Sequence, residues 1–123
     1  MKTIVAGSRS ITKYKHVVDA INLCGWIPSV IIEGEASGVD TLAKRYGWLN
    51  NIPVDPHPAA WQINGYLDKG AGAKRNQEMA NIAEALVLVW DGVSTGSKDM
   101  LDRARKKGLK VFVYIPEEYK DNE

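Results

Sequence analysis

Three short stretches rich in glycine and hydroxyl residues could bind an anion. They are residues 7–10 (GSRS), residues 34–40 (GEASGVD) and residues 91–97 (DGVSTGS). Each follows a run of apolar residues, and the latter two lead into a predicted helix. Glycine lets a phosphate oxygen approach the backbone, and the first N–H groups of a helix have no partner within the helix. Serine and threonine hydroxyls would add donors, so the pattern predicts phosphate binding.

Charged side chains in and near these stretches could complete such a site. Arg9 and Arg75 could each make a paired contact to a phosphate or a carboxylate. A carboxylate repels a phosphate, so Glu35 and Asp91 would face ribose hydroxyls or a base, or else accept hydrogen bonds from loop N–H groups. Each stretch alone could be no more than a turn. Together, at one edge of a sheet, they favour a phosphate site.

Several of these residues also have a purely structural interpretation. Ser37 and Asp40 form a capping-box-like pair that could serve only the helix after it. Glu78 is expected to be a helical partner of Lys74 and Arg75. Tryptophans belong mostly in the core, but Trp61 lies in the irregular segment 56–72, where its ring could stack on a base.

Length, charge and cysteine content restrict the classes of function. The 123 residues fit one domain, and the formal net charge of +1 gives little general attraction to nucleic acid or to a membrane surface. A single cysteine, Cys24, allows no internal disulfide and favours a cytoplasmic location. No stretch is apolar enough for a membrane span, so no membrane partner is predicted.

The elements that must position the three stretches alternate along the chain. Apolar runs predict strands, and residues at helical spacing predict helices between them. The predicted strands cover residues 3–6, 30–32, 52–54, 86–90 and 110–114, and the predicted helices cover 16–24, 37–47, 73–83 and 98–107. This order predicts an α/β fold, a Rossmann-like, doubly wound open parallel sheet of about five strands with helices on both faces. Residues 1–116 would form a single nucleotide-binding domain, followed by a charged tail, residues 117–123, that is expected to fray.

The sequence lacks the motifs that mark several kinds of site. The glycines match neither Gly-x-Gly-x-x-Gly nor a P-loop, so a dinucleotide fingerprint and a nucleoside triphosphatase are not supported. His16 and His57 have no second ligand at metal spacing, and the order of residues suggests no Ser/His/Asp triad. No metal and no cofactor are predicted.

Four motifs, taken together and in order, resemble the SLOG superfamily. They are AGSRS at residues 6–10, EGEASGVDTLAKRYG at 33–47, GAGAKRNQEM at 70–79 and VWDGVSTGSKDMLDRARKKG at 89–108. That superfamily unites Smf/DprA proteins with Lonely Guy and YpsA-like proteins, and the small stand-alone branch called YspA or cpYpsA-related is the most similar. The resemblance implies a bacterial or phage protein whose strand-end loops bind nucleotides or nucleotide derivatives, with ADP-ribose-like molecules in range.

The resemblance completes the set of expected ligand-binding residues. It matches Arg75 and Asn76 to an Arg-Asn pair of the branch, and it places Ser97 where the branch usually has threonine. The expected residues are Gly7, Ser8, Arg9, Gly34, Glu35, Ser37, Gly38, Asp40, Arg75, Asn76, Asp91, Gly92, Ser94, Thr95, Gly96 and Ser97. Catalytic residues stay unassigned.

Three functions follow from the resemblance and the residues. The leading hypothesis is a domain that binds a small phosphate-bearing nucleotide derivative as a sensor or to sequester it. The first alternative is a Lonely Guy-like N-glycosidic hydrolase of nucleoside 5′-monophosphates, so enzymatic activity is left open. Against it, Met100 stands at the position of the family's catalytic glutamate, and Asp99 is one residue early. The second alternative is DprA-like binding of single-stranded DNA, which the balanced charge disfavours. Relatives often dimerise, which leaves a homodimer open.

Overall fold

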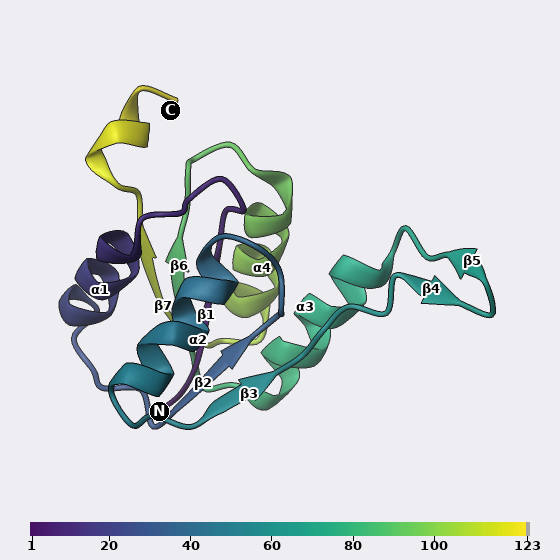
Figure 1. Cartoon of the computed structure of the whole chain (residues 1–123), viewed down its shortest axis with the longest axis horizontal. Coiled ribbons are helices and arrows are strands. Elements are labelled where there is room, and N and C mark those ends of the chain that lie inside the picture. The colour runs from purple at the N-terminus through teal and green to yellow at the C-terminus, as the bar shows by residue number, and fades with distance from the viewer. Residues whose placement is uncertain (123) are drawn as a thin grey trace.

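The computed structural model describes residues 1–122, and it contains a five-stranded parallel sheet (Figure 1). The strands, in chain order, are β1 (Lys2–Gly7), β2 (Val30–Glu33), β3 (Val54–Pro56), β6 (Ala85–Val89) and β7 (Lys110–Tyr114). Their spatial order is β3-β2-β1-β6-β7, and every neighbouring pair is parallel. The predicted Rossmann-like α/β fold is confirmed.

Four helices cover the two faces of this sheet. The helices α1 (Tyr14–Leu23) and α2 (Val39–Leu49) pack on one face, and α3 (Ala71–Ile82) and α4 (Thr95–Lys106) pack on the other. Within residues 1–122, no helix is both long and apolar enough to cross a membrane.

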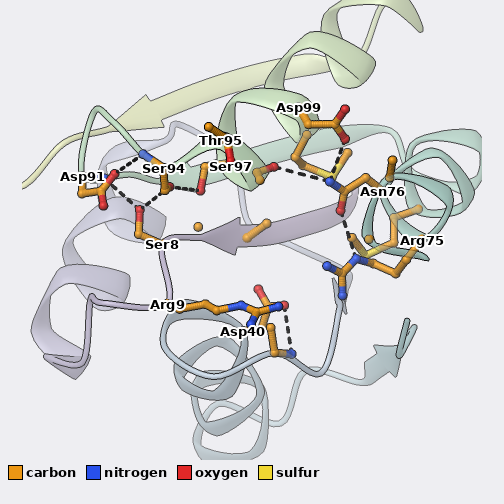
Figure 2. A pocket seen from close by; sticks show the side chains of 18 of the residues that line it. Ser8, Arg9, Asp40, Arg75, Asn76, Asp91, Ser94, Thr95, Ser97 and Asp99 are labelled. Carbon is orange, nitrogen blue, oxygen red and sulfur yellow. Dashed lines mark hydrogen bonds between the residues drawn. The ribbon is translucent and has the colours of Figure 1, made fainter. Parts of the chain in front are cut away.

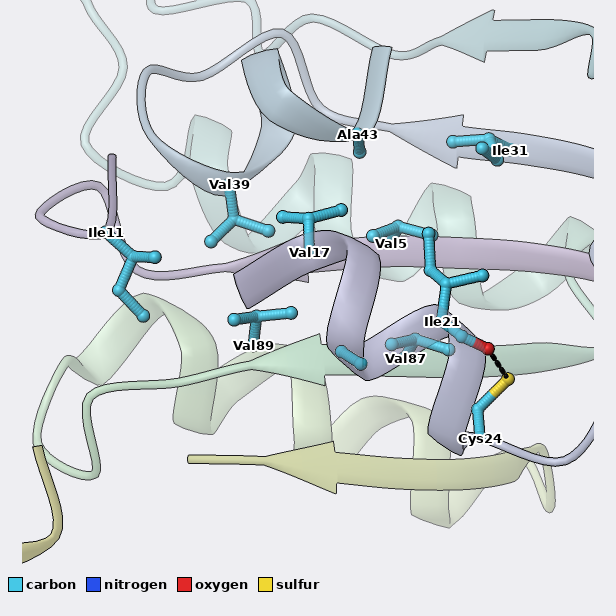
Figure 3. Close-up of a cluster of buried hydrophobic side chains, with 11 residues drawn as sticks. Val5, Ile11, Val17, Ile21, Cys24, Ile31, Val39, Ala43, Val87 and Val89 are labelled. Atoms are coloured by element: carbon cyan, nitrogen blue, oxygen red, sulfur yellow. Dashed lines mark hydrogen bonds between the residues drawn. The ribbon is translucent and has the colours of Figure 1, made fainter. Parts of the chain in front are cut away.

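The interior strand β6 shows why the sheet needs a helical layer on each face. Its residues are apolar and fully buried, and their side chains alternate between faces. Val87 and Val89 join the cluster under α1 and α2 (Figure 3), while Leu86 and Leu88 join the cluster under α3 and α4. Burying one such side chain stabilises the fold by roughly 1.5–3 kcal/mol, so β6 ties the two layers together.

The strand order reverses between β1 and β6, and this reversal locates a crevice. From β1 the chain continues through α1 to β2 on one side, whereas from β6 it continues through α4 to β7 on the other side. Gly7 at the end of β1 lies opposite Val89 at the end of β6. The loops that leave these two strands therefore separate and leave a space between them, where open α/β sheets bind ligands.

The segment 56–72 is more ordered than its sequence suggests. Its sequence predicts no regular structure, but it contains an antiparallel hairpin of β4 (Gln62–Ile63) and β5 (Tyr66–Leu67), which projects from the body of the molecule (Figure 1). Asn64 and Gly65 connect the strands with φ angles of 54° and 82°. An Asn-Gly pair with both φ angles positive is a common two-residue hairpin turn, and this was the signal that the sequence analysis missed.

The end of the described chain is a short 3₁₀ helix, Glu117–Asn122. Glu118 accepts hydrogen bonds from Lys13, and the Tyr119 side chain packs against the cluster under α1. The fraying expected for the tail stays a prediction.

Candidate functional site

The loops at the carboxyl ends of β1 and β6 enclose a cavity of about 680 Å³ together with α3 and α4 (Figure 2). This volume lies in the usual range for small-molecule sites. Eleven of the sixteen expected ligand-binding residues line it. They are Gly7, Ser8, Arg9, Asp40, Arg75, Asn76, Asp91, Ser94, Thr95, Gly96 and Ser97.

The other five expected residues lie behind the cavity wall or on the surface. Gly34 and Gly38 support the wall: a Cβ on Gly34 would lie 2.4 Å from Arg75, and one on Gly38 would lie 2.5 Å from the Arg9 carbonyl oxygen. Glu35 forms an ion pair with Lys44 instead of facing the cavity. The remaining two are Ser37, which is exposed, and Gly92, whose φ of 86° permits the turn before α4.

A network of hydroxyl groups joins the loops after β1 and β6. The Ser8 and Ser94 Oγ atoms are 3.0 Å apart, and Ser94 donates to Ser97 Oγ at 2.9 Å. The backbone N–H of Asp91 donates to Ser8 Oγ at 3.0 Å. These bonds hold three hydroxyls side by side beside the first turn of α4 (Figure 2).

The N-terminus of α4 is available to an anion. Ser94 is its N-cap, and among the described residues its side chain makes no capping bond to the helix backbone. The N–H groups of the first helical turn have no partner within the helix, and the helix dipole adds partial positive charge there. Thr95 and Gly96, at this turn, line the cavity.

Asp91 uses its carboxylate to shape the loop. Its Oδ1 accepts hydrogen bonds from the N–H groups of Val93 at 2.9 Å and Ser94 at 2.8 Å. Burial raises the pKa of Asp91, but the N–H groups of Ser94 and Val93 outweigh that effect, so the pKa is lower than usual and the carboxylate is charged. Of the two interpretations left open by the sequence, the structure favours the one in which Asp91 satisfies loop N–H groups.

Asp40 lies between the two arginines of the cavity (Figure 2). Burial raises the pKa of Asp40 to about 6. The N–H groups of Ala36 and Gly34 and the charges of Arg75 and Arg9 lower it, but by less than burial raises it. Its Oδ2 accepts from the Ala36 N–H at 3.2 Å. The capping-box interpretation was wrong, because Gly38, and not Ser37, is the N-cap of α2.

Arg75 and Asn76 are oriented by different parts of the chain. Arg75 Nη1 donates to the Gly34 carbonyl oxygen at 2.6 Å, and its Nε donates to Asn76 Oδ1 at 3.0 Å. Asn76 Nδ2 donates in turn to Asp99 at 2.9 Å, and Arg103 Nε donates to the same carboxylate at 2.9 Å. Burial raises the pKa of Asp99, yet Arg103 and Asn76 lower it more, so Asp99 stays ionised.

Other lining residues lie outside this expected set, although the sequence had already pointed to Trp61 as a ring that could stack on a base and to Ser10 as part of the first stretch. They include Ser10, Ala36, Trp61, Gly72, Met79, Asp99 and Met100. Met79 on α3 and Met100 on α4 are both buried, and they line the cavity where these two helices meet. The expected pairing of Glu78 with Lys74 and Arg75 was wrong: Glu78 Oε1 accepts a hydrogen bond from His57 Nδ1 at 3.1 Å, and Lys74 pairs with Asp68.

Among residues 1–122, no group of three or more His, Cys, Asp or Glu side chains is arranged to hold a metal ion. No family model matches the sequence, and no curated protein matches it.

One solved structure shows the same fold. The X-ray structure of DNA processing protein A (DprA) from Streptococcus pneumoniae matches with a TM-score of 0.73 and 20% sequence identity. The match covers 91% of this chain and 49% of the DprA chain, so this chain spans about half the length of that protein. The likeness establishes the fold, and the resemblance to the SLOG superfamily and its YspA branch stays a prediction.

Proposed function

We propose that the protein binds a phosphate-bearing nucleotide or nucleotide derivative in the cavity between β1 and β6, and acts as a sensor or sequestering domain. The observation that carries this proposal is the meeting of three groups of donors at one cavity. They are the uncapped N-terminus of α4, the hydroxyls of Ser8, Ser94 and Ser97, and the guanidinium groups of Arg9 and Arg75.

The charge balance of the cavity supports an anionic ligand. Asp99 is bound to Arg103 and Asn76, and Asp91 is bound to backbone N–H groups, so both carboxylates already have partners. Asp40 stands beside Arg75 and Arg9, whose positive charges offset that of its carboxylate. A phosphate at α4 would leave Asp40 free to accept a hydrogen bond from a ribose hydroxyl.

Hydrolysis of an N-glycosidic bond has less support. It requires an acid or base placed at the glycosidic bond. The lowered pKa of Asp99 makes it a poor proton donor, and Asp40, whose pKa is about 6, accepts a hydrogen bond from the Ala36 N–H and stands beside two arginines. Met100 lines the cavity where the Lonely Guy pattern has its glutamate. Glu78, another acid on α3, is not among the lining residues and contacts His57.

Binding of single-stranded DNA is the second candidate, because the fold is shared with a DNA processing protein. Lys13, Lys15, Lys69 and Lys74 could form a basic groove with Arg75, but three of these four lysines are in ion pairs. Lys13 pairs with Glu118, Lys15 with Asp19, and Lys74 with Asp68, at 2.7–3.2 Å. Together with a formal net charge of +1, these pairs leave little sequence-independent attraction to a phosphate backbone.

Titration calorimetry tests these candidates with one panel. We expect AMP, ADP, cyclic AMP or ADP-ribose to bind, and Arg75→Ala to weaken that binding about tenfold or more, because a charged hydrogen bond is worth roughly 1.5–3 kcal/mol. Arg105→Ala is the matched control, since Arg105 is exposed at the other end of α4. Failure of every small molecule to bind would overturn the proposal. Salt-dependent binding of an oligothymidylate by the wild type would promote the second candidate.

A further inference from the structure

Trp61 is the one large aromatic side chain among the residues that line the described cavity. It immediately precedes β4, and its carbonyl oxygen accepts a hydrogen bond from the N–H of Asp68 at 2.6 Å, which closes the base of the hairpin. Its side chain is not part of either core cluster, and 42% of the residue is exposed. An indole ring normally buries more of its surface, so the cavity wall carries apolar area that lacks a partner.

Two contacts orient the Trp61 indole ring. On one side its benzo edge lies against the first turn of α3, where a Cβ on Gly72 would approach the ring to 3.2 Å. The absence of a side chain at Gly72 therefore lets the indole lie close to the helix backbone. Over the face of the ring lies the guanidinium of Arg9, 5.9 Å from the ring centroid.

The gap between Arg9 and Trp61 is suited to a flat ring. Carbon atoms in contact lie about 3.5–4 Å apart, so a planar group between the indole and the guanidinium would need roughly 7 Å in all. The present separation is 5.9 Å. A shift of about 1 Å by the exposed Arg9 side chain, or by the projecting hairpin, would admit a ring with one face on each partner. Both indole and guanidinium planes are surfaces on which nucleobases stack.

We infer that Trp61, with Arg9 opposite, forms a subsite that stacks the nucleobase, or an equivalent flat aromatic ring, of the ligand whose phosphate lies at the N-terminus of α4. The inference rests on the proposed function and adds to it the chemical class of the second half of the ligand. The ring is recognised by its π-face rather than by hydrogen bonds to its edge, so this subsite tolerates different bases.

A matched pair of probes isolates the subsite. AMP and ribose 5-phosphate share the sugar and the phosphate and differ only by the base. We expect the wild type to bind AMP more tightly than ribose 5-phosphate. In Trp61→Ala, binding of AMP should weaken roughly 10- to 100-fold, the usual loss for one base–aromatic stack, while binding of ribose 5-phosphate changes less than twofold. Trp61→Phe should recover most of the affinity for AMP. Trp48→Ala is the control, because Trp48 is 70% exposed and does not line the cavity.

The possible results separate the two proposals. If the wild type binds AMP and ribose 5-phosphate equally well, or if Trp61→Ala weakens both alike, the stacking subsite is overturned while the phosphate site stands. If the wild type binds neither probe, the phosphate site at α4 fails for this class of ligand, and the stacking inference fails with it. A change of oligomeric state in Trp61→Ala with unchanged affinity for AMP would show that the ring contacts another copy of the chain, and would also overturn the inference.

Discussion

The guanidinium of Arg75 donates a hydrogen bond to the carbonyl oxygen of Gly34 at 2.6 Å, across 41 positions of the chain. The contact exists because Gly34 has no side chain: a Cβ there would lie 2.4 Å from Arg75 Nη1 and 2.9 Å from Asp40 Oδ2. One glycine thus sets the position of the strongest donor of the cavity and of its buried carboxyl group.

Gly34→Ala should therefore impair binding more than folding. The clashing atoms are the ends of two side chains, which can move, so we expect the free energy of unfolding to change by less than about 1 kcal/mol. Affinity for the nucleotide that binds best to the wild type should fall about tenfold or more, since Arg75 loses its orientation. Calorimetry and urea unfolding measure the two effects. Gly70→Ala is the control, because that Cβ meets only ordinary contacts and Gly70 does not line the cavity.

Thr95→Asp should move stability and affinity in opposite directions. A carboxylate in the first turn of α4 interacts favourably with the helix dipole and should stabilise the fold by about 0.3–1 kcal/mol. The same charge stands where the phosphate is proposed to bind, so binding should be lost. Thr95→Asn, which adds no charge, should retain most of the affinity. If Thr95→Asp binds the nucleotide as well as the wild type does, the phosphate does not lie at α4.

Asp40 should make the protein less stable as the pH rises from about 4 to about 6. Its pKa is raised from 3.8 to about 6 because burial disfavours the charged form. Between these values the folded state holds more protons than the unfolded chain, so the free energy of unfolding decreases with pH, by at most about 3 kcal/mol. Above pH 6 the whole penalty is present.

Asp40→Asn removes this titration and provides the comparison. In urea unfolding at pH 4.5 and 7.5, we expect the wild type to lose stability relative to the variant at the higher pH. If the free energies of unfolding of the wild type and Asp40→Asn differ by the same amount at both pH values, the Asp40 carboxyl titrates normally in the fold.

Gly38→Ala should destabilise the protein by about 3 kcal/mol or more. Gly38 has φ 74° and ψ −128°, a conformation that only glycine adopts readily. A Cβ would also lie 2.6 Å from the Ser8 carbonyl oxygen, and neither backbone can move without disturbing the cavity. Gly108→Ala serves as the control, since Gly108 has φ 76° with open space around it. This substitution should lower the free energy of unfolding by only about 1 kcal/mol. Equal losses would refute the role of crowding at Gly38.

Local patterns were sufficient to predict the sheet and its helices. The strand at residues 110–114 was predicted with the bounds that β7 has, because residues 111–114 form a continuous apolar run, although β7 is an edge strand and these residues are only partly buried. The boundaries were less accurate where propensity is ambiguous: α3 begins at Ala71, two residues earlier than predicted, because the small residues before Lys74 carry no helical period. The hairpin at Asn64-Gly65 was missed because its strands have only two residues each.

Partnerships within the cavity were beyond prediction from local patterns. Arg75 could be seen as a ligand for an anion, but its contact with Gly34 depends on how α3 packs against the loop after β2. The assignment of Glu78 to Arg75 failed for the same reason, because His57 offered a tertiary partner that helical spacing does not reveal. Asp99 was considered only as a displaced catalytic acid, whereas the fold makes it the acceptor that orients Asn76.

The hydrogen-bonded pair Ser8 and Ser94 is separated by 86 positions. During synthesis, the first hydroxyl leaves the ribosome long before the second, and neither can meet the other until β6 has inserted beside β1. A nucleotide would accordingly bind only after the whole domain has been made and has folded. A fragment ending before residue 90 would not bind the same molecule.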